Sequence, residues 1–241
     1  MSFNGIKFAT SVPGMIPWEI VLAYFVIATG LVLYFSKKIG FKGFTTIDLV
    51  YIGIGAAFSV VWEFYIGAFI SRAIPSTPFV SITFWGRMFI VFIVAALVRK
   101  PGVGMLSLTI FDVLADIFHY GFGGQPLYFI YEALTYGLFV DIMIVISRGK
   151  LFGIGYKPSN GSVGIIRSPA LIAAIQGAVL GLLWAIPDPI FYYAFFRPLI
   201  YGAIVNWQYA IFHLIAFIPG DIIIGIIAAI TSLRIVKAVG Q

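Results

Sequence analysis

The amino-acid sequence predicts an all-α integral membrane protein, and three observations support this fold class. Of the 241 residues, 61% are hydrophobic and only 10% are charged, which leaves too little polar surface for a water-soluble globule. The mean hydropathy is +1.07, and apolar runs of about the 20 residues that a helix needs to cross a bilayer recur along the whole chain. The 24 Phe residues do not fit the alternating pattern of a membrane β-barrel.

The hydropathy pattern predicts seven membrane-spanning helices, at residues 16–35, 47–70, 80–98, 102–120, 126–146, 169–186 and 207–236. The first run is longer than the apolar core of a signal peptide and has no basic stretch before it. It is followed by Ser36, Lys37 and Lys38, without a small-residue cleavage pattern. We therefore expect this run to be retained as a helix.

Basic residues predict the orientation of these helices, because loops on the cytoplasmic side of a membrane are rich in Lys and Arg. Eleven of the fifteen basic residues follow the first, third, fifth and last helices: Lys37, Lys38, Lys42, Arg99, Lys100, Arg148, Lys150, Lys157, Arg167, Arg234 and Lys237. Lys7, Arg72 and Arg197 fall on the opposite side, and Arg87 lies inside a helix. The N-terminus is therefore expected outside and the C-terminus in the cytoplasm. Orientation and anionic lipid account for the formal charge of +6, so no nucleic-acid partner is implied.

The stretch PDPIFYYAFFRPLIYGAIVNW, residues 187–207, is apolar and aromatic but is interrupted by Pro187, Pro189 and Pro198. If this stretch were another full span, the basic residues Arg234 and Lys237 would lie outside, against the charge rule. We therefore predict an external loop or a re-entrant segment packed over the bundle.

Ionisable side chains within the predicted spans converge on the outer half of the bundle. Asp112, Asp116 and His119 follow one another at spacings of four and three residues, so they share one stripe of a helix. Three further residues lie at a similar depth on the second and fifth helices: Trp62, Glu63 and Glu132. Because charge is costly in hydrocarbon, such groups are functional or mutually paired.

Two interpretations of these acids stay open. In the first, they snorkel to the headgroups or form structural ion pairs with Arg72, Arg87 and Arg197. In the second, they form a ligand site together with nearby aromatic residues, some of which an interfacial aromatic belt also explains. The aromatic residues are Trp62, Tyr120, Tyr128, Tyr131, Trp184, Tyr192 and Tyr193. Acids combined with aromatic rings suit a flat organic cation.

Small residues form a second pattern, in YIGIGAAFS of the second helix, where Gly53 and Ala57 or Gly55 and Ser59 are four positions apart. Such a face allows another helix to approach closely, either within the chain or from a partner. The sequence has no nucleotide-binding loop, zinc-protease signature or nucleophile elbow. It has no Cys, which excludes disulfides and thiolate sites, and its two His residues are too few for a histidine-rich metal or haem site.

Three segments, taken in order, resemble a known family. FTTIDLVYIGIGAAFSVVW (44–62) carries the small-residue face, VRKPGVGMLSLTIFDVLADIFHYGFGGQPLYFIYEALTYGLFVDIMI (98–144) carries most of the acids, and the last helix contains Gly and ends in basic residues. Together they resemble the substrate-binding S component of an energy-coupling factor (ECF) vitamin transporter of the hydroxymethylpyrimidine/thiamine type. The similarity is fair over residues 44–147 and weak over 169–240.

The resemblance implies a multi-pass protein of the cell membrane with a six-helix core, residues 44–241, preceded by one extra transmembrane helix in residues 1–43. It implies a transport subunit that has no cofactor and no ATPase activity of its own. Its partners would be membrane lipid, a transmembrane coupling subunit, two ATPase subunits and a small vitamin, which we expect to be thiamine or its pyrimidine precursor.

The resemblance also suggests where ligand and partner bind. The ligand contacts of the family map to His119, Gln125, Tyr128 and Glu132, and the depth argument adds Trp62, Glu63, Asp116 and Trp184. The docking surface for the coupling subunit maps to Gly53, Ala56 and Ala57. Partial replacement of the alanines of that motif by Gly leaves the docking register open.

Other classes of function are not excluded by the sequence. An ion-coupled secondary transporter would use a carboxylate relay of Asp112, Asp116, Glu132, Asp141 and Asp221, although such folds usually contain internal repeats and none is evident here. A metal-specific S component would use an N-terminal histidine, which MSFNGIKF lacks. An intramembrane aspartyl protease would pair the aspartates of LAD and PGD, but its Gly-x-Gly-Asp pattern is absent. A structural subunit of a larger membrane complex is the last alternative.

Overall fold

The computed structural model describes residues 6–156 and 168–240, and these ranges are helical apart from their connections. The elements are α1 (Trp18–Ile39), α2 (Thr46–Val61), the π-helical η2 (Trp62–Ile66), α3 (Gly67–Ile70), α4 (Ile82–Val98), α5 (Val103–Phe118), α6 (Leu127–Glu132), the π-helical η3 (Ala133–Gly137), α7 (Leu138–Ile146), the 3-10 turn η4 (Leu151–Gly153), α8 (Pro169–Trp184), the π-helical η5 (Pro187–Phe196), α9 (Arg197–Tyr201) and α10 (Trp207–Ala238). The described residues contain one isolated bridge, between Thr77 and Val80, and no strand. The prediction of an all-α fold is confirmed.

Five helical segments are long and apolar enough to cross a membrane: Trp18–Ile39, Thr46–Ile70, Leu127–Ile146, Pro169–Tyr201 and Trp207–Ala238. These segments support the prediction of a multi-pass membrane protein. The other two predicted spans correspond to α4 and α5, which have 17 and 16 residues. At 1.5 Å per residue, each is about 25 Å long, slightly less than the roughly 30 Å of the hydrocarbon core. These two shorter helices carry Arg87 and Asp112.

Of the two alternatives predicted for residues 187–207, the external loop is wrong for most of its length, because residues 187–201 continue the helical path of α8 after a short break at Ala185 and Ile186. The re-entrant segment stays a prediction. The three prolines do not prevent this. Pro187 and Pro189 lie in the first turn of η5, which follows the break at Ala185 and Ile186, whereas Pro198 lies inside the continuous path from η5 into α9. A proline near a helix start removes an N–H group that has no intrahelical partner there. The connection to α10 is therefore only residues 202–206.

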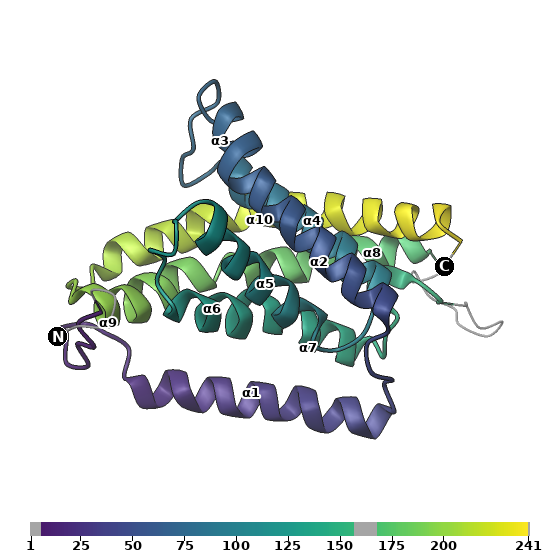
Figure 1. Cartoon of the computed structure of the whole chain (residues 1–241), viewed down its shortest axis with the longest axis horizontal. Helices are drawn as coiled ribbons and strands as arrows, with labels where there is room; N and C mark the ends of the chain where they lie inside the picture. The colour runs from purple at the N-terminus through teal and green to yellow at the C-terminus, as the bar shows by residue number, and fades with distance from the viewer. Residues whose placement is uncertain (1–5, 157–167, 241) are drawn as a thin grey trace.

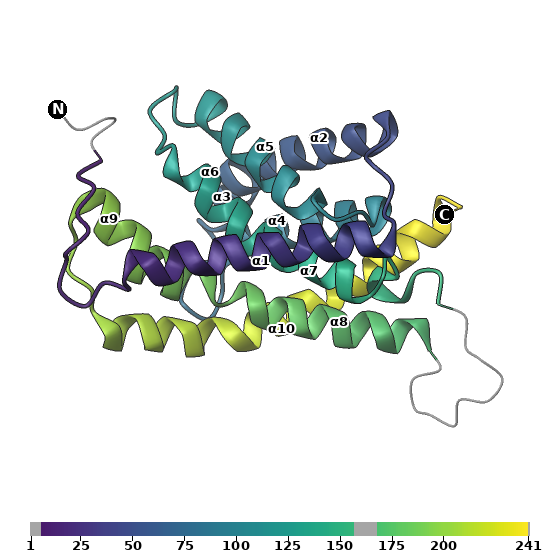
Figure 2. The same cartoon turned by 90° about the horizontal axis from the view of Figure 1, so that it is seen from below.

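The helices are arranged on both sides of α4, which packs against α2 and against α10. In Figure 2, α2 and α5 lie above α4, whereas α8 and α10 lie below it as an antiparallel pair. Among the largest fully buried side chains are Met88 and Phe92 of α4 and Trp184 of α8, so the core follows α4. Helix α1 lies along the outside of the bundle and packs on α7 (Figure 1).

The loops that carry most basic residues meet at one end of the bundle. The Lys100 Nζ donates a hydrogen bond to the Gly43 carbonyl oxygen at 3.0 Å and pairs with Asp48, which closes a capping box with Thr45 at the start of α2. The C-terminus lies at this same end (Figure 1), whereas the backbone N–H of Ile16 donates to the Ala194 carbonyl oxygen at the opposite end. The clustering agrees with the predicted charge pattern, of which Lys157 and Arg167 lie outside the described residues.

Glycines allow two pairs of helices to touch through their backbones. A Cβ atom on Gly104 of α5 would lie 3.0 Å from the carbonyl carbon of Gly137 in η3. Along the α8–α10 contact, a Cβ on Gly177 would lie 2.9 Å from the carbonyl carbon of Gly225, and a Cβ on Gly181 would lie 2.7 Å from that of Asp221. These distances are shorter than van der Waals contact, so the helices reach this separation only with glycine at these positions.

Candidate binding site

A cavity of about 330 Å³ lies between α4 and its neighbours, and side chains from most helices of the bundle line it. Its volume falls at the lower end of the range for small-molecule sites, which is about 300–1,000 Å³. The loop before α4 contributes Phe79 and the loop after α5 contributes Tyr120, and both of these residues are exposed. The cavity therefore reaches the surface at the end of the bundle opposite the basic loops.

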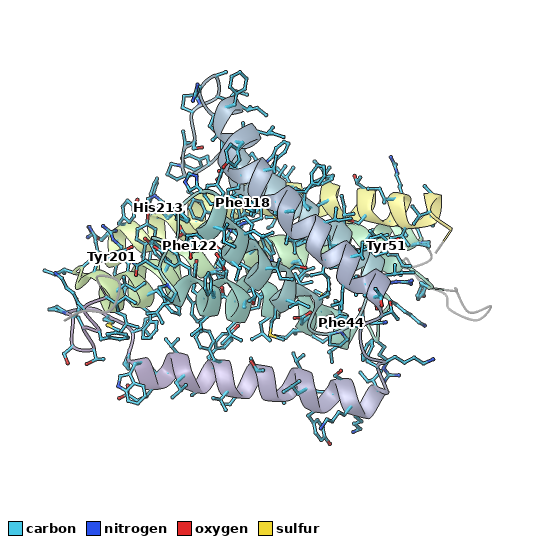
Figure 3. The ribbon with its side chains drawn as sticks, viewed as in Figure 1. Phe44, Tyr51, Phe118, Phe122, Tyr201 and His213 are labelled. Carbon is cyan, nitrogen blue, oxygen red and sulfur yellow. The ribbon has the colours of Figure 1, made fainter. Side chains whose placement is uncertain are left out.

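Residues around this opening are aromatic. The Tyr65 hydroxyl donates to the Phe118 carbonyl oxygen at 3.0 Å and so ties η2 to the end of α5. Phe118 and Phe122 lie at this end of α5 and in the following loop (Figure 3), and both side chains are strongly exposed. The surface around the opening therefore suits an apolar or interfacial environment.

Arg87 is the central charged group of the cavity, and its side chain lies between two glutamates. The residue is 4% exposed. Its Nε atom lies 2.9 Å from Glu63 Oε2, and its Nη1 atom donates to both carboxylate oxygens of Glu132 at 2.7 and 2.8 Å. The guanidinium carbon also lies 4.7 Å from the ring centroid of Phe111 and 5.7 Å from that of Tyr136. The walls of the cavity therefore already hold one planar cation by carboxylates and aromatic faces.

Three more carboxylates line the same cavity: Asp112 on α5, Asp188 at the start of η5 and Asp221 on α10. Asp112 and Asp188 both lie close enough to Arg87 and Glu132 to interact with them electrostatically. Among the described lining residues, five carboxyl groups thus face a single basic side chain. Because a low-dielectric site strengthens the attraction of unlike charges, this excess of acids favours a cationic ligand.

Two of these aspartates, Asp112 and Asp221, have a carboxylate oxygen without a hydrogen-bond partner among the described residues. Asp221 Oδ1 accepts a hydrogen bond from the Trp85 indole nitrogen at 2.8 Å, but its Oδ2 atom has no partner among the described residues. Asp112 Oδ2 also lacks a partner there, and so does the indole nitrogen of Trp184. Glu63 Oε2 and Arg87 Nε are likewise without a hydrogen bond, but they lie 2.9 Å apart as an ion pair. Because buried polar atoms are normally hydrogen-bonded, the three atoms outside this ion pair are the positions of the wall that a ligand could bond.

Irregular helical segments surround the cavity. All three π-helical segments of the described chain contribute lining side chains, among them Glu63 from η2, Tyr136 from η3 and Asp188 from η5. Helix α10 contains Pro219 two residues before Asp221, where the missing N–H interrupts the hydrogen-bond ladder. Single π-helical turns and helix interruptions are frequent at functional sites, and here they converge on one cavity.

Four of the eight residues predicted from the sequence to bind ligand line the cavity: Glu63, Tyr128, Glu132 and Trp184. Glu63 and Glu132 do so as partners of Arg87. The interpretation of structural ion pairs therefore describes these two residues correctly, although they also belong to a cavity.

The other four predicted residues lie outside the lining. The Trp62 indole nitrogen donates to the Ile82 carbonyl oxygen at 3.1 Å, which joins η2 to α4. Asp116 accepts a hydrogen bond from the Gly124 N–H at 2.6 Å and so holds the α5–α6 loop. The His119 ring stacks on Phe64 with centroids 4.2 Å apart. Gln125 lies at the end of that loop, before α6.

Arg87, Asp188 and Asp221 line the cavity but are not among the residues predicted to contact ligand. Asp112 also lines it and belongs to the predicted cluster of acids, although not to the eight predicted ligand residues. Arg87 was considered only as a structural partner, and Asp221 only as a member of a relay. Asp188 lies in the proline-rich stretch that was predicted to be a loop. A signal for Asp188 and Asp221 did exist, because each is an acid within an apolar helical segment.

Asp141, another buried acid, binds backbone N–H groups and does not face the cavity. Its two carboxylate oxygens accept hydrogen bonds from the backbone N–H groups of Gly104 and Met105, at 2.9 and 3.0 Å, in the first turn of α5. A carboxylate at a helix start satisfies N–H groups that have no intrahelical partner. Asp141 does not line the cavity.

Replacing Asp141 with Asn should therefore lower the free energy of unfolding by about 1–2 kcal/mol, because one charged acceptor of two N–H groups becomes a neutral acceptor of one. Ligand affinity should not change. Thermal unfolding in detergent and ligand titration check both statements. A variant of unchanged stability that loses transport would instead place Asp141 in a relay.

The predicted docking residues separate into two groups on α2. Ala56 is buried against α5, whereas Ala57 is exposed and Gly53 is half-buried with open space around its Cα. The outer face of α2, which also carries Tyr51 (Figure 3), continues with the exposed side chains of Ile54 and Phe58. Only Gly53 and Ala57 are therefore placed to contact a partner helix.

No family model, curated protein or solved structure matches this chain.

Proposed function

We propose that this chain is the membrane-embedded substrate-capture subunit of an ATP-driven vitamin uptake transporter, and that its cavity binds thiamine or the pyrimidine precursor of thiamine. The observation that carries the proposal is the cavity itself, where five carboxyl groups face one guanidinium between aromatic walls. Thiamine is a compact organic cation with two flat rings. Carboxylates offset its charge, and aromatic side chains stack on its rings.

The proposal includes a topology of seven spans, in which α4 and α5 cross as the two short helices. The N-terminus lies outside and the cytoplasmic end carries the basic loops, in keeping with the charge rule. This orientation makes the opening beside Phe79 and Tyr120 the external entrance of the site.

The partners would be a transmembrane coupling subunit and two ATPase subunits in the cell membrane. The strip formed by the half-buried Gly53 and the exposed Ala57 on α2 is the surface we assign to the coupling subunit, because small residues allow helices to approach closely. Transport then follows from differential binding: the vitamin binds the outward-open state, and ATP hydrolysis in the partner favours a state with a different opening.

Purification without added ligand, followed by mass spectrometry of the released small molecules, tests the proposal directly. A cationic vitamin or its pyrimidine is expected in the extract. An empty protein that also fails to bind added thiamine would contradict the proposed ligand.

Replacing Glu132 with Gln should weaken thiamine binding by about tenfold or more, because a charged wall group of the cavity becomes neutral. Trp85 and Trp184 both line the cavity, so quenching of tryptophan fluorescence reports binding. Glu19→Gln, in the first turn of α1, is the matched control and should bind as the unmodified protein does. Unchanged affinity in Glu132→Gln would remove this residue from the site.

Uptake measured in cells distinguishes the proposed ATP-driven subunit from an ion-coupled secondary transporter. Uptake that survives inactivation of the ATPase subunits would favour it. Two members of its expected relay already serve the backbone, since Asp116 holds the α5–α6 loop and Asp141 caps α5.

A further inference from the structure

Outside the Arg87 ion pair, three buried polar atoms of the cavity wall are positioned to bond an occupant, and two of them are carboxylate oxygens. Asp112 is 8% exposed, Asp221 is 2% exposed and Trp184 is 1% exposed, and each has one polar atom without a hydrogen-bond partner among the described residues. The two carboxylate oxygens require hydrogen-bond donors, and the indole N–H requires an acceptor.

The two unpartnered carboxylate oxygens are on different walls of the cavity. Asp112 belongs to α5, which packs with α2, and Asp221 belongs to α10, which packs with α8. These two helix pairs lie on opposite sides of α4 (Figure 2). A single ligand that bonds both oxygens must therefore present donors at two ends.

Arg87 does not supply these donors. Its guanidinium is already shared between Glu63 and Glu132, at 2.7 to 2.9 Å. Trp85 supplies one donor to Asp221, but to the other oxygen of that carboxylate. The acids of the cavity thus include a glutamate pair in ion-pair contact with Arg87 and an aspartate pair in which one oxygen of each has no hydrogen-bond partner among the described residues.

On the basis of the proposed function, we infer that the cavity binds a planar cation with N–H donors at both ends, which bridges Asp112 and Asp221, more tightly than a quaternary cation of the same size. The thiazolium nitrogen of thiamine is itself quaternary, so of the two proposed ligands this selectivity favours the pyrimidine precursor, whose ring amino group carries N–H donors. A quaternary nitrogen carries charge but no N–H, so it leaves the facing oxygen without a hydrogen bond. An amidinium group offers parallel N–H donors to a carboxylate. The flat ring between the two ends lies against aromatic walls that include Phe111 and Tyr136.

A matched pair of probes tests this inference on the unmodified full-length protein in detergent. 4-Aminobenzamidine has an amidinium and an amine at opposite ends of a benzene ring. (4-Aminophenyl)trimethylammonium has the same single charge, ring and amine, but its cationic end has no N–H. Isothermal titration is expected to show that 4-aminobenzamidine binds at least tenfold more tightly.

Variants assign the two ends. Asp112→Asn and Asp221→Asn should each reduce 4-aminobenzamidine affinity at least tenfold. The quaternary probe should lose affinity mainly in the variant of the aspartate that its amine faces. Asp116→Asn, one turn from Asp112 on the same helix and outside the lining, should bind both probes as the unmodified protein does. Thermal unfolding of each variant confirms folding, and the two-probe comparison needs no variant.

The outcomes separate this inference from the proposed function. Equal affinity for the two probes, or failure of 4-aminobenzamidine to bind while thiamine binds, would overturn the inference and leave the cation site in place. If neither probe nor thiamine binds, the proposed function fails together with it.

Discussion

Replacing Arg87 with Met is expected to lower the free energy of unfolding by about 3–5 kcal/mol, the usual cost of leaving buried charges without their partner. The substitution keeps an apolar stem of similar length but removes the only basic group in the described lining of the cavity. Glu63 and Glu132 would then lie close together with no counter-charge. Thermal unfolding in detergent, followed by fluorescence, measures the effect.

Two further variants make this prediction specific. Arg72→Met removes an exposed guanidinium that lies 6.0 Å from the Phe69 ring centroid, and it should leave stability unchanged. Adding Glu63→Gln and Glu132→Gln to Arg87→Met should restore at least half of the loss, because the uncompensated charges disappear. An Arg87→Met protein that unfolds at the unmodified temperature would show that this pairing does not stabilise the bundle.

Replacing Gly181 with Ala is expected to cost about 3 kcal/mol, at the upper end for an overpacked core. The new Cβ would lie 2.7 Å from the carbonyl carbon of Asp221 and 2.9 Å from Ile222 Cα, and backbone atoms cannot move aside as a side chain can. Helices α8 and α10 would have to separate. Because Trp184 and Asp221 lie beside this contact, ligand affinity should fall as well.

Gly53→Ala is the matched control on another helix. Nothing lies within 4 Å of a Cβ atom at Gly53, so alanine fits there without a clash. Alanine is also the better helix former, and stability should stay the same or rise by up to about 1 kcal/mol. If both variants had the same unfolding temperature, the close α8–α10 approach would not limit stability.

Hydropathy predicted the helices well because the apolar runs are long and separated by charged or glycine-rich turns. It failed at residues 187–201, where the prolines were interpreted as interruptions. The break at Ala185 and Ile186 places Pro187 and Pro189 in a first turn, where proline is tolerated, whereas Pro198 is accommodated inside the helical path, where proline is disfavoured.

The candidate site could be predicted only in part. The sequence indicates how deep a residue lies along a helix more readily than it indicates which neighbour the side chain faces. Asp112 and Asp116 share a stripe, yet Asp112 lines the cavity and Asp116 turns to the Gly124 N–H. The choice depends on the α5–α6 loop, which folds back over the end of α5. Similarly, Arg87 pairs with Glu63 and Glu132 only because η2, α4 and α6 meet at the cavity. The spacing of these three residues in the sequence does not indicate this meeting.

The π-helical segments have a consequence for how such a cavity arises. A π-turn contains one residue more than an α-turn, and one inserted residue rotates the following side chains by about 100° around the helix axis. The segments η2, η3 and η5 each carry an acid or a tyrosine that faces the cavity. Single-residue insertions in membrane helices can therefore turn existing polar side chains from one neighbour to another, and a pocket can change its lining without a change in residue type.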